Sequence, residues 1–346
     1  MKKDIINKNI IMTEIIESIS IAKQWLQEAS VSGGLFEKTG LSYRGLFKAP
    51  LGFQSVGLFP EAARSLNILK SKFIQADGDF RDPPEVELDI HPAPSLQFFY
   101  PYRTSWVTIG AQRLGRYDIS RATGNFILSL QDNNTGGFLA SMNSSARYFN
   151  IVGTSQAVLA ALALGEWDAA KKGADFLVNV FEIQSAHLQR FYTTVDEHLS
   201  VVEDWPPAAS GYGSLEIGKP NQYSYVTGLA AAVLAVSYRI FGQQRHLQAS
   251  KGYYDFTVRI HEDTFTNPAC GKLMWSAALL YTITDEPKYL EHCELASKTI
   301  CSIINRIPHM HIDTIYPDYT KQPVPFTFEV AFEYIYWLTE VVKELL

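Results

Sequence analysis

Hydrophobic and polar positions divide this chain into two alternating kinds of helical segment. One kind is poor in charge and rich in small apolar residues, as in residues 154–164 and 225–235. The other kind has one polar face, as in the segments that follow Gly57, Gly115 and Gly165. A helix that is apolar all round is buried, whereas a helix with a polar face lies at the surface. The pattern therefore predicts inner helices and outer helices in alternation.

Tight turns join each inner helix to the outer helix that follows it. Four of these turns begin with a glycine, and acidic residues or proline open the next helix, as helix ends favour. The glycines are Gly57, Gly115, Gly165 and Gly242, and residues 284–287 form a fifth turn. Loops with a glutamine and a following aromatic residue close each unit, most clearly in ILSLQDNNTGGF and VFEIQSAHLQRF. The unit recurs about six times, at a period of roughly 45 to 75 residues.

The two ends of the chain each supply half a unit. Residues 13–27 read as an outer helix with no inner helix before it, and residues 327–346 read as an inner helix with no outer helix after it. Pairing these two segments closes a ring. The sequence therefore predicts an all-α fold, an (α/α)6 toroid of six helical hairpins with a central cavity. No linker rich in Ser, Gly or Pro interrupts the repeat, so residues 1–346 are expected to form one domain.

The recurring glutamines are expected to be structural. Gln75, Gln131 and Gln184 stand at equivalent places in their loops. A side-chain amide there can bond backbone groups of the next loop and tie adjacent hairpins together.

Composition excludes several classes of partner. The net charge of −6, without a cluster of Lys and Arg, opposes nucleic-acid binding. No apolar run reaches the length of about 18 residues that a membrane span needs. Cys293 and Cys301 are about 12 Å apart along one helix, too far for a disulfide, and Cys270 stands alone. Because no apolar run could span a membrane, we expect a cytoplasmic protein. We expect no cofactor, since neither a dinucleotide fingerprint nor a P-loop is present. The oligomeric state is not predicted.

The glutamine loops resemble those of known toroid enzymes. QADGDF and QDNNTGGF are similar to loop repeats of terpenoid cyclases and prenyltransferase β-subunits, and equally to loops of six-hairpin glycosidases, sugar epimerases and polysaccharide lyases. The resemblance covers nearly the whole chain as architecture and implies the toroid fold with a site at the mouth of its cavity. The D-x-D-D acid motif of squalene–hopene cyclases and the zinc ligands of prenyltransferases have no match, so it assigns no catalytic residues.

Three loops at the mouth are long enough to suggest function. The loop of residues 192–222 holds the densest group of ionisable residues, and carboxylates beside an imidazole suit acid–base catalysis. We predict catalytic roles for Asp196, His198 and Asp204. The loop of residues 77–104 is expected to bind substrate through its acidic, basic and aromatic side chains, which suit sugars, carboxylates or phosphates. Its candidates are Asp79, His91, Tyr102 and Arg103.

The third long loop contains His309, His311 and Asp313 at alternating positions. Two imidazoles and a carboxylate can form a three-ligand metal face. A short exposed hairpin explains the pattern more simply, so no metal site is predicted.

Polar residues are rare on the predicted inner helices, and a charge in such a place must be paired or must line a wet cavity. Glu329 and Glu333 lie one helical turn apart, with Lys272 as a candidate partner. We predict that Glu329 is catalytic and faces the cavity, and that Glu333 contacts substrate. Residues at similar early positions on other inner helices complete the predicted pocket: Trp106, Gln156, Tyr223, Tyr225 and Trp275.

These features favour an enzyme that acts on a carbohydrate or uronate-like small molecule by Asp/Glu/His acid–base catalysis, as a hydrolase, epimerase or lyase. One alternative is a cyclase, isomerase or transferase of isoprenoid or other natural-product biosynthesis, because the same aromatic faces stabilise a carbocation. Another is a toroid that binds its ligand without catalysis. A small molecule is the expected partner in each case.

Overall fold

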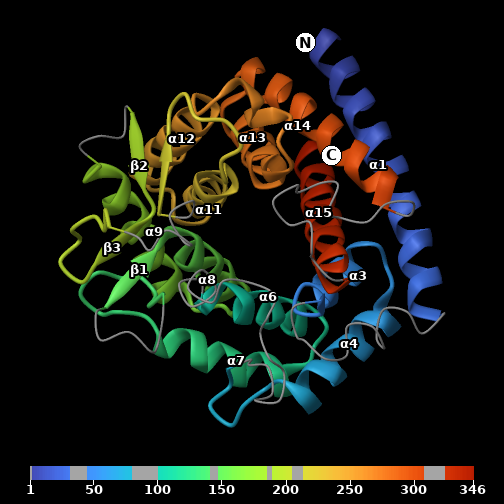
Figure 1. Cartoon of the computed structure of the whole chain (residues 1–346), viewed down its shortest axis with the longest axis horizontal. Helices are drawn as coiled ribbons and strands as arrows, with labels where there is room; N and C mark the ends of the chain where they lie inside the picture. Colours follow the sequence, from blue (N-terminus) through green and yellow to red (C-terminus); the bar gives the residue numbers. More distant parts are fainter. Residues whose placement is uncertain are drawn as a thin grey trace.

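A ring of paired helices makes up the computed structural model, which describes residues 2–31, 45–79, 100–140, 147–184, 189–204, 213–307 and 324–346 (Figure 1). Twelve α-helices lie in this part of the chain. The inner helices are α3 (Ala49–Ser55), α6 (Tyr100–Arg113), α8 (Ile151–Leu164), α11 (Tyr225–Phe241), α13 (Gly271–Thr284) and α15 (Val324–Leu345). The outer helices are α1 (Lys2–Val31), α4 (Phe59–Lys72), α7 (Tyr117–Ser129), α9 (Trp167–Glu182), α12 (Gln244–Val258) and α14 (Pro287–Arg306).

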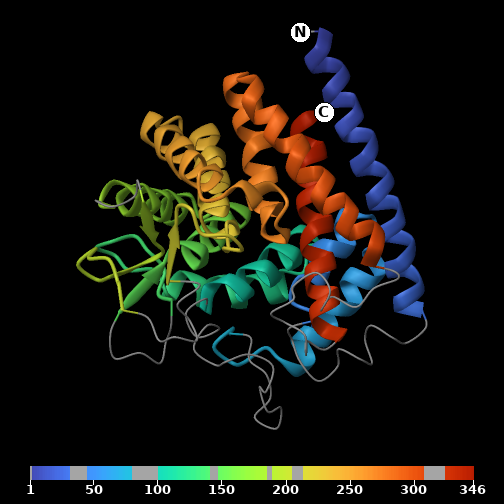
Figure 2. The ribbon, with the colours of Figure 1, turned by 45° about the horizontal axis from the view of Figure 1, so that its top comes forward.

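Contacts between neighbouring helices close the ring. Each inner helix packs against the next inner helix, and α15 packs back onto α3. Five outer helices pack on the inner helix that precedes them, and α1 lies beside α14 and α15 (Figure 2). The two end segments therefore form the sixth pair, so the predicted (α/α)6 toroid with closing ends is confirmed. α1 extends beyond its predicted segment at both ends, and α15 begins at Val324, before the predicted start at residue 327. No described helix is long and apolar enough to cross a bilayer.

Burial follows the hydrophobic pattern. In α11 the run from Val226 to Ala235 is buried without interruption, as expected for an inner helix. In α9 the buried residues recur along one face, among them Ala170, Ala174 and Leu177. Apolar contact between these two layers forms the core.

The tight turns have the predicted backbone. Gly57, Gly115, Gly165 and Gly242 have φ values of +78°, +70°, +80° and +66°, a region that glycine enters without steric cost. In the turn without glycine, Asp285 takes the same conformation at φ +57°. Aspartate tolerates this region better than most residues.

The glutamine loops fasten hairpins to one another. The Gln131 side-chain amide donates to the carbonyl of Gly136, at 3.0 Å, and to that of Ala169 on α9, at 2.9 Å. The structural role predicted for Gln131 is therefore confirmed. Gln184 binds the backbone of Tyr192 through both amide atoms, at 3.0 Å each, and Gln75 donates to the carbonyl of Phe73. These bonds stabilise the glutamines' own loops.

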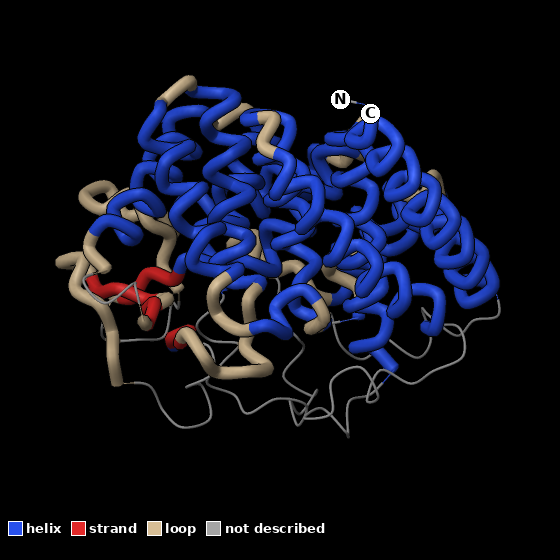
Figure 3. Tube along the Cα trace, turned by 90° about the horizontal axis from the view of Figure 1, so that it is seen from above, coloured by secondary structure: helices blue, strands red, loops and turns tan. Residues whose placement is uncertain are grey.

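Two short antiparallel ladders shape the loop face. β1 (Tyr148–Asn150) pairs with β3 (Thr194–Asp196), and β2 (Arg190–Tyr192) pairs with β4 (Ser214–Glu216). All four strands lie together at one side of the helical ring (Figure 3). Two 3-10 turns, η3 (Glu262–Phe265) and η4 (Pro268–Cys270), lead into α13.

Candidate active site

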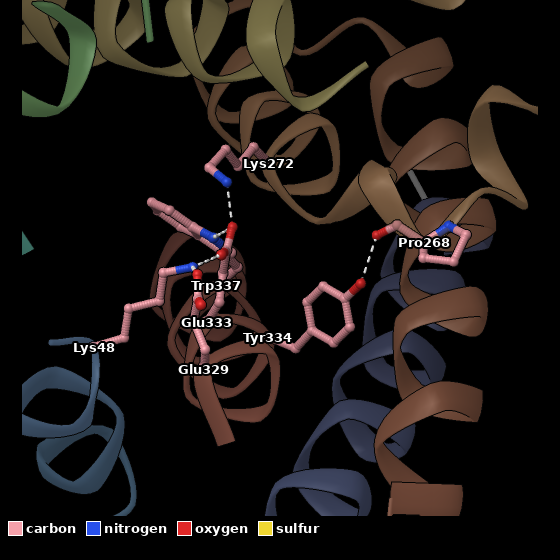
Figure 4. A network of polar contacts seen from close by, with 7 residues as sticks. All are labelled: Lys48, Pro268, Lys272, Glu329, Glu333, Tyr334 and Trp337. Atoms are coloured by element: carbon pink, nitrogen blue, oxygen red, sulfur yellow. Dashed lines mark hydrogen bonds and ion pairs between the residues drawn. The ribbon is translucent and has the colours of Figure 1, made fainter. Parts of the chain in front are cut away.

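Four charged side chains meet on the inner side of the ring. Glu329 and Glu333 are one turn apart on α15, on the side of that helix turned away from α1 and α14 (Figure 4). Lys48 immediately precedes α3, and Lys272 is the second residue of α13. These four residues, called here the charge cluster, therefore join three parts of the chain that are far apart in sequence.

The charge cluster is a continuous network of ion pairs. Lys48 donates to Glu329 Oε1 at 3.0 Å and also binds Oε2 of Glu333. Lys272 binds the other oxygen of the same carboxylate, Glu333 Oε1. Trp337 Nε1 donates to that oxygen at 3.3 Å. Glu333 is thus shared between both lysines, whereas Lys48 is the lysine shared between both glutamates.

Burial makes this network energetically important. Lys48 and Lys272 are each 3% exposed and Glu329 is 9% exposed, while the side chain of Glu333 remains 14% exposed. An unpaired charge at such depth costs several kcal/mol, so two positive and two negative groups compensate one another.

The two lysines differ in their electrostatic surroundings. Burial alone would lower the pKa of Lys48, but the carboxylates of Glu329 and Glu333 outweigh it and raise that pKa. Burial also lowers the pKa of Lys272, and the Glu333 carboxylate opposes this shift. The ammonium of Lys48 lowers that pKa further, so it stays below its ordinary value. Burial would raise the pKa of Glu333, but the ammonium groups of Lys272 and Lys48 hold it at about 2.

Aromatic rings surround the charge cluster. The ammonium of Lys272 lies 4.5 Å from the ring centroid of Tyr225, and both cluster lysines lie 5.6 Å from that of Tyr102. Trp106 is 5.6 Å from the ammonium of Lys48. Such contacts stabilise a buried ammonium through the negative face of the ring. The structure therefore brings Tyr102, Trp106 and Tyr225 together with the charge cluster, as predicted.

Other predicted lining residues extend this aromatic surround. Trp275 stacks on Trp337 at 4.9 Å, and Tyr223 lies 5.8 Å from Tyr225 between ring centroids. Gln156 on α8 is fully buried, and neither atom of its amide has a hydrogen-bond partner in the described chain. Leaving a buried polar group unsatisfied costs about 1–3 kcal/mol, so this amide calls for a ligand or a water molecule.

Two candidates from the predicted loop of residues 77–104 have distinct surroundings, and one of them, Arg103, lies within α6. Burial lowers the pKa of Arg103 to about 10, and the nearby Glu329 carboxylate opposes this shift. Arg103 thus lies in the field of the charge cluster and stays protonated at neutral pH. Asp79 is 1% exposed and accepts a hydrogen bond from the hydroxyl of Thr104 on α6, at 3.4 Å. This contact favours a structural role for Asp79.

The predicted catalytic loop lies away from the charge cluster. Asp196 Oδ1 accepts hydrogen bonds from the backbone N–H of His198, at 2.9 Å, and of Ser200, at 2.8 Å, which fix a turn. His198 and Asp204 are exposed. Strand β3 lies at the periphery, across the ring from α15 (Figures 1 and 2). The structure therefore does not bring Asp196, His198 or Asp204 together with Glu329.

Several predicted candidates fall outside the described residues, namely His91, His309, His311 and Asp313. Within the described ranges, no group of three or more His, Cys, Asp or Glu side chains is arranged to hold a metal ion.

Lys48 was missed by the sequence analysis. It is the only charge between Leu46 and Phe53, in a run that is otherwise nearly all apolar. The rule that singled out the α15 glutamates, a charge in an inner apolar segment, applies equally to Lys48. Lys48 was overlooked because it precedes the helix, where helical periodicity gives no information.

Solved structures share this fold, although no protein-family model and no curated protein matches the sequence. A crystal structure of D-mannose isomerase matches with a TM-score of 0.61 and 14% identity, over 88% of this chain and 86% of that one. An unsaturated glucuronyl hydrolase specific for heparin matches with a TM-score of 0.61 and 9% identity, over 96% and 97%. An inactive variant of an α-1,6-mannanase from Salegentibacter sp., in complex with α-1,6-mannotriose, matches with a TM-score of 0.54 and 10% identity. This match covers 95% of this chain and 99% of that one. At such low identity these similarities establish the toroid fold.

Proposed function

We propose that this chain is an enzyme that acts on a carbohydrate or uronate-like small molecule at the inner side of the ring. The observation that carries the proposal is the charge cluster, in which four ionisable groups are buried beneath aromatic side chains. A site for binding alone does not need this arrangement, because each buried charge must be offset by a partner. The similar structures add support, since they include a D-mannose isomerase, an unsaturated glucuronyl hydrolase and a variant of an α-1,6-mannanase.

The surrounding side chains suit a sugar with an acidic group. The faces of Tyr102 and Tyr225, both half-buried, match the apolar faces of a pyranose ring. Lys48 and Arg103 supply positive charge for a carboxylate. We therefore favour a uronate or a related acidic sugar as substrate.

The chemistry of the charge cluster disfavours the isoprenoid alternative. A cyclase that protonates an alkene needs a neutral acid beside an aromatic floor, whereas Glu333 stays ionised because its pKa is about 2. Acid–base catalysis on a polar substrate can use these charges, whereas protonation of an alkene needs an uncharged carboxylic acid. Cytoplasmic location remains a prediction from the sequence.

Turnover of a substrate panel tests the proposal. Purified protein is incubated with hexoses, uronates and unsaturated uronyl disaccharides, and the products are followed by ¹H NMR. Glu329→Gln is the site variant, and Glu17→Gln, exposed on α1, is the matched control. We expect turnover of an acidic sugar by wild type and by Glu17→Gln, with loss of rate in Glu329→Gln. Ligand binding without turnover would instead favour the binding toroid, and turnover of a prenyl diphosphate would favour the cyclase.

A further inference from the structure

The two lysines of the charge cluster are not equivalent in their contacts. Lys48 reaches both carboxylates, with Glu329 Oε1 at 3.0 Å and Glu333 on its other side. Lys272 binds only Glu333 among these carboxylates, and its ammonium lies against the face of Tyr225 at 4.5 Å. Lys48 is therefore held between two carboxylates, whereas Lys272 binds one carboxylate, that of Glu333, which it shares with Lys48.

We propose that Lys272 is the residue that transfers the proton, and Lys48 the fixed cation beside it, in an isomerisation or epimerisation at a carbon next to a carbonyl group. This inference rests on the proposed function and specifies its reaction class. It differs from the Asp/Glu/His catalysis expected from the sequence, because it assigns the base to a lysine.

The electrostatics of the charge cluster agree with this division of roles. When the surroundings of two titratable groups push their pKa values apart, one is suited to exchange protons and the other to remain charged. The pKa of Lys272 is lowered and that of Lys48 is raised. The charged or titratable groups that face Lys272 come from the segment before α3, from α6, from α11 and from α15: Lys48, Tyr102, Tyr225, Glu329 and Glu333.

The proposed step is balanced without a further reactant. When Lys272 is deprotonated, its amine takes the proton from the carbon, and the C–H electron pair forms a C=C bond. The carbonyl π electrons move to oxygen, where the Lys48 ammonium stabilises the resulting enolate. Return of the proton to either face of the same carbon gives an epimer, and return to the neighbouring carbon gives an isomer. No electron donor or acceptor is consumed.

Hydrolysis of a glycosidic bond fits the charge cluster less well. That reaction needs a protonated carboxylic acid to protonate the leaving oxygen. Glu333 is bound to two ammonium groups and stays ionised, so it cannot supply this proton. Glu329 is itself ion-paired with Lys48, which also favours its charged form. A lysine that gives up its proton more readily than usual is suited to abstract one.

Charge-conserving variants separate catalysis from ion pairing. Lys272→Arg keeps the positive charge beside Glu333 but does not deprotonate, whereas Lys272→Met removes both functions. Lys72→Met, exposed on α4, is the control. Substrate turnover and incorporation of deuterium from D₂O beside the carbonyl are measured by NMR. We expect both Lys272 variants to lose about a hundredfold to ten-thousandfold in kcat, Lys48→Arg to keep more activity than Lys272→Arg, and the control to match wild type. Activity in Lys272→Arg close to that of wild type would overturn the proposal and leave Lys272 a counter-ion.

A measurement that needs no substrate distinguishes this failure from failure of the proposed function. In protein labelled with ¹³Cε-lysine, the Lys272 signal is identified by the ring-current shift from Tyr225 and by its absence in Lys272→Arg. A titration midpoint for this signal at lower pH than the midpoints of the exposed lysines supports the inference, even if no sugar in the panel reacts. Titration together with the exposed lysines overturns it.

Discussion

The two carboxylates on α15 carry unequal shares of the ion pairing. Glu333 binds both lysines and Trp337, whereas the ion pair of Glu329 within the charge cluster is with Lys48. Removing one partner of a buried pair costs about 3–5 kcal/mol. We therefore expect Glu333→Gln to lower the free energy of unfolding by about that amount, and Glu329→Gln to lower it by less, because Lys48 keeps Glu333. Urea denaturation of both variants measures the difference. Equal losses would contradict this assignment.

Acid should weaken the protein through Glu333. Its pKa lies at about 2 in the folded chain, below its ordinary value of 4.5. A carboxyl with a lowered folded pKa contributes stability above its unfolded pKa, and this contribution is lost as pH falls through the folded pKa. We expect the stability advantage of wild type over Glu333→Gln to be constant above about pH 5 and to shrink from about pH 4.5 toward pH 2. Thermal unfolding across this range tests it; an advantage that shrank at neutral pH would be inconsistent with this account.

Residue positions were predictable from the sequence only where helical periodicity constrains them. Glu329 and Glu333 stood out because they are charged residues in an apolar inner segment. The structure pairs Glu333 with Lys272, the predicted candidate, and pairs Glu329 with Lys48. Lys48 lies outside a helix, and its partners are far away along the chain, so no local pattern marks it. The partners of Asp196 were equally invisible, because its turn forms through backbone N–H groups that every residue carries.

At the scale of single elements, the glutamine loops require glycine for two reasons. Gly136 has φ +79°, and a Cβ there would lie 2.5 Å from the carbonyl oxygen of Lys172 on the next outer helix. Gly165 has a similar φ, +80°, but nothing lies within 4 Å of its Cβ position. We expect Gly165→Ala to cost only the backbone penalty of about 1–2 kcal/mol, and Gly136→Ala to cost clearly more. The difference between the two unfolding free energies isolates the contact between hairpins. Equal costs would mean that the loop moves freely away from α9.

The bond from Gln131 to α9 gives a second test of how hairpins adhere. Gln131→Leu removes two side-chain hydrogen bonds, to Gly136 and Ala169. We expect a loss of about 1–3 kcal/mol, since each bond contributes about 0.5–1.5 kcal/mol. Gln24→Leu is the control, because its side chain bonds only Glu28 on the same exposed helix face. A loss no larger than that of the control would show that the loop holds its place without the amide.

Helices and turns were predictable because their signals are periodic or depend on single residues, as with Gly115 or Pro287. The strand ladders were not, because strands of three residues show no alternation to read. Their pairing depends on contacts between loops that lie well apart in sequence, Tyr148 against Asp196 and Arg190 against Glu216. The sequence predicts where the repeat is longest, but not how its loops fold.

For the molecule as a whole, the distance of the long loop from the charge cluster changes what its variants should do. If these side chains contact substrate only as it enters the ring, they affect KM more than kcat. We expect at least one of Asp196→Asn, His198→Ala and Asp204→Asn to raise KM while kcat stays close to that of wild type. Steady-state kinetics of the folded variants on the true substrate decides this. Unchanged kcat/KM in all three would make the loop a structural cover.

The gap between the two ends of the chain lies where the other hairpins have their tight turn. In five hairpins the chain runs from an inner helix through such a turn into an outer helix, and α15 followed by α1 repeats that order across the termini (Figure 2). The order of inner and outer helices around the ring is therefore the same at the chain ends as at the other hairpins. A circular permutant that joins residue 346 to residue 2 by a short linker and opens at Gly165, whose Cβ position is surrounded by empty space, should form the same toroid with its charge cluster intact.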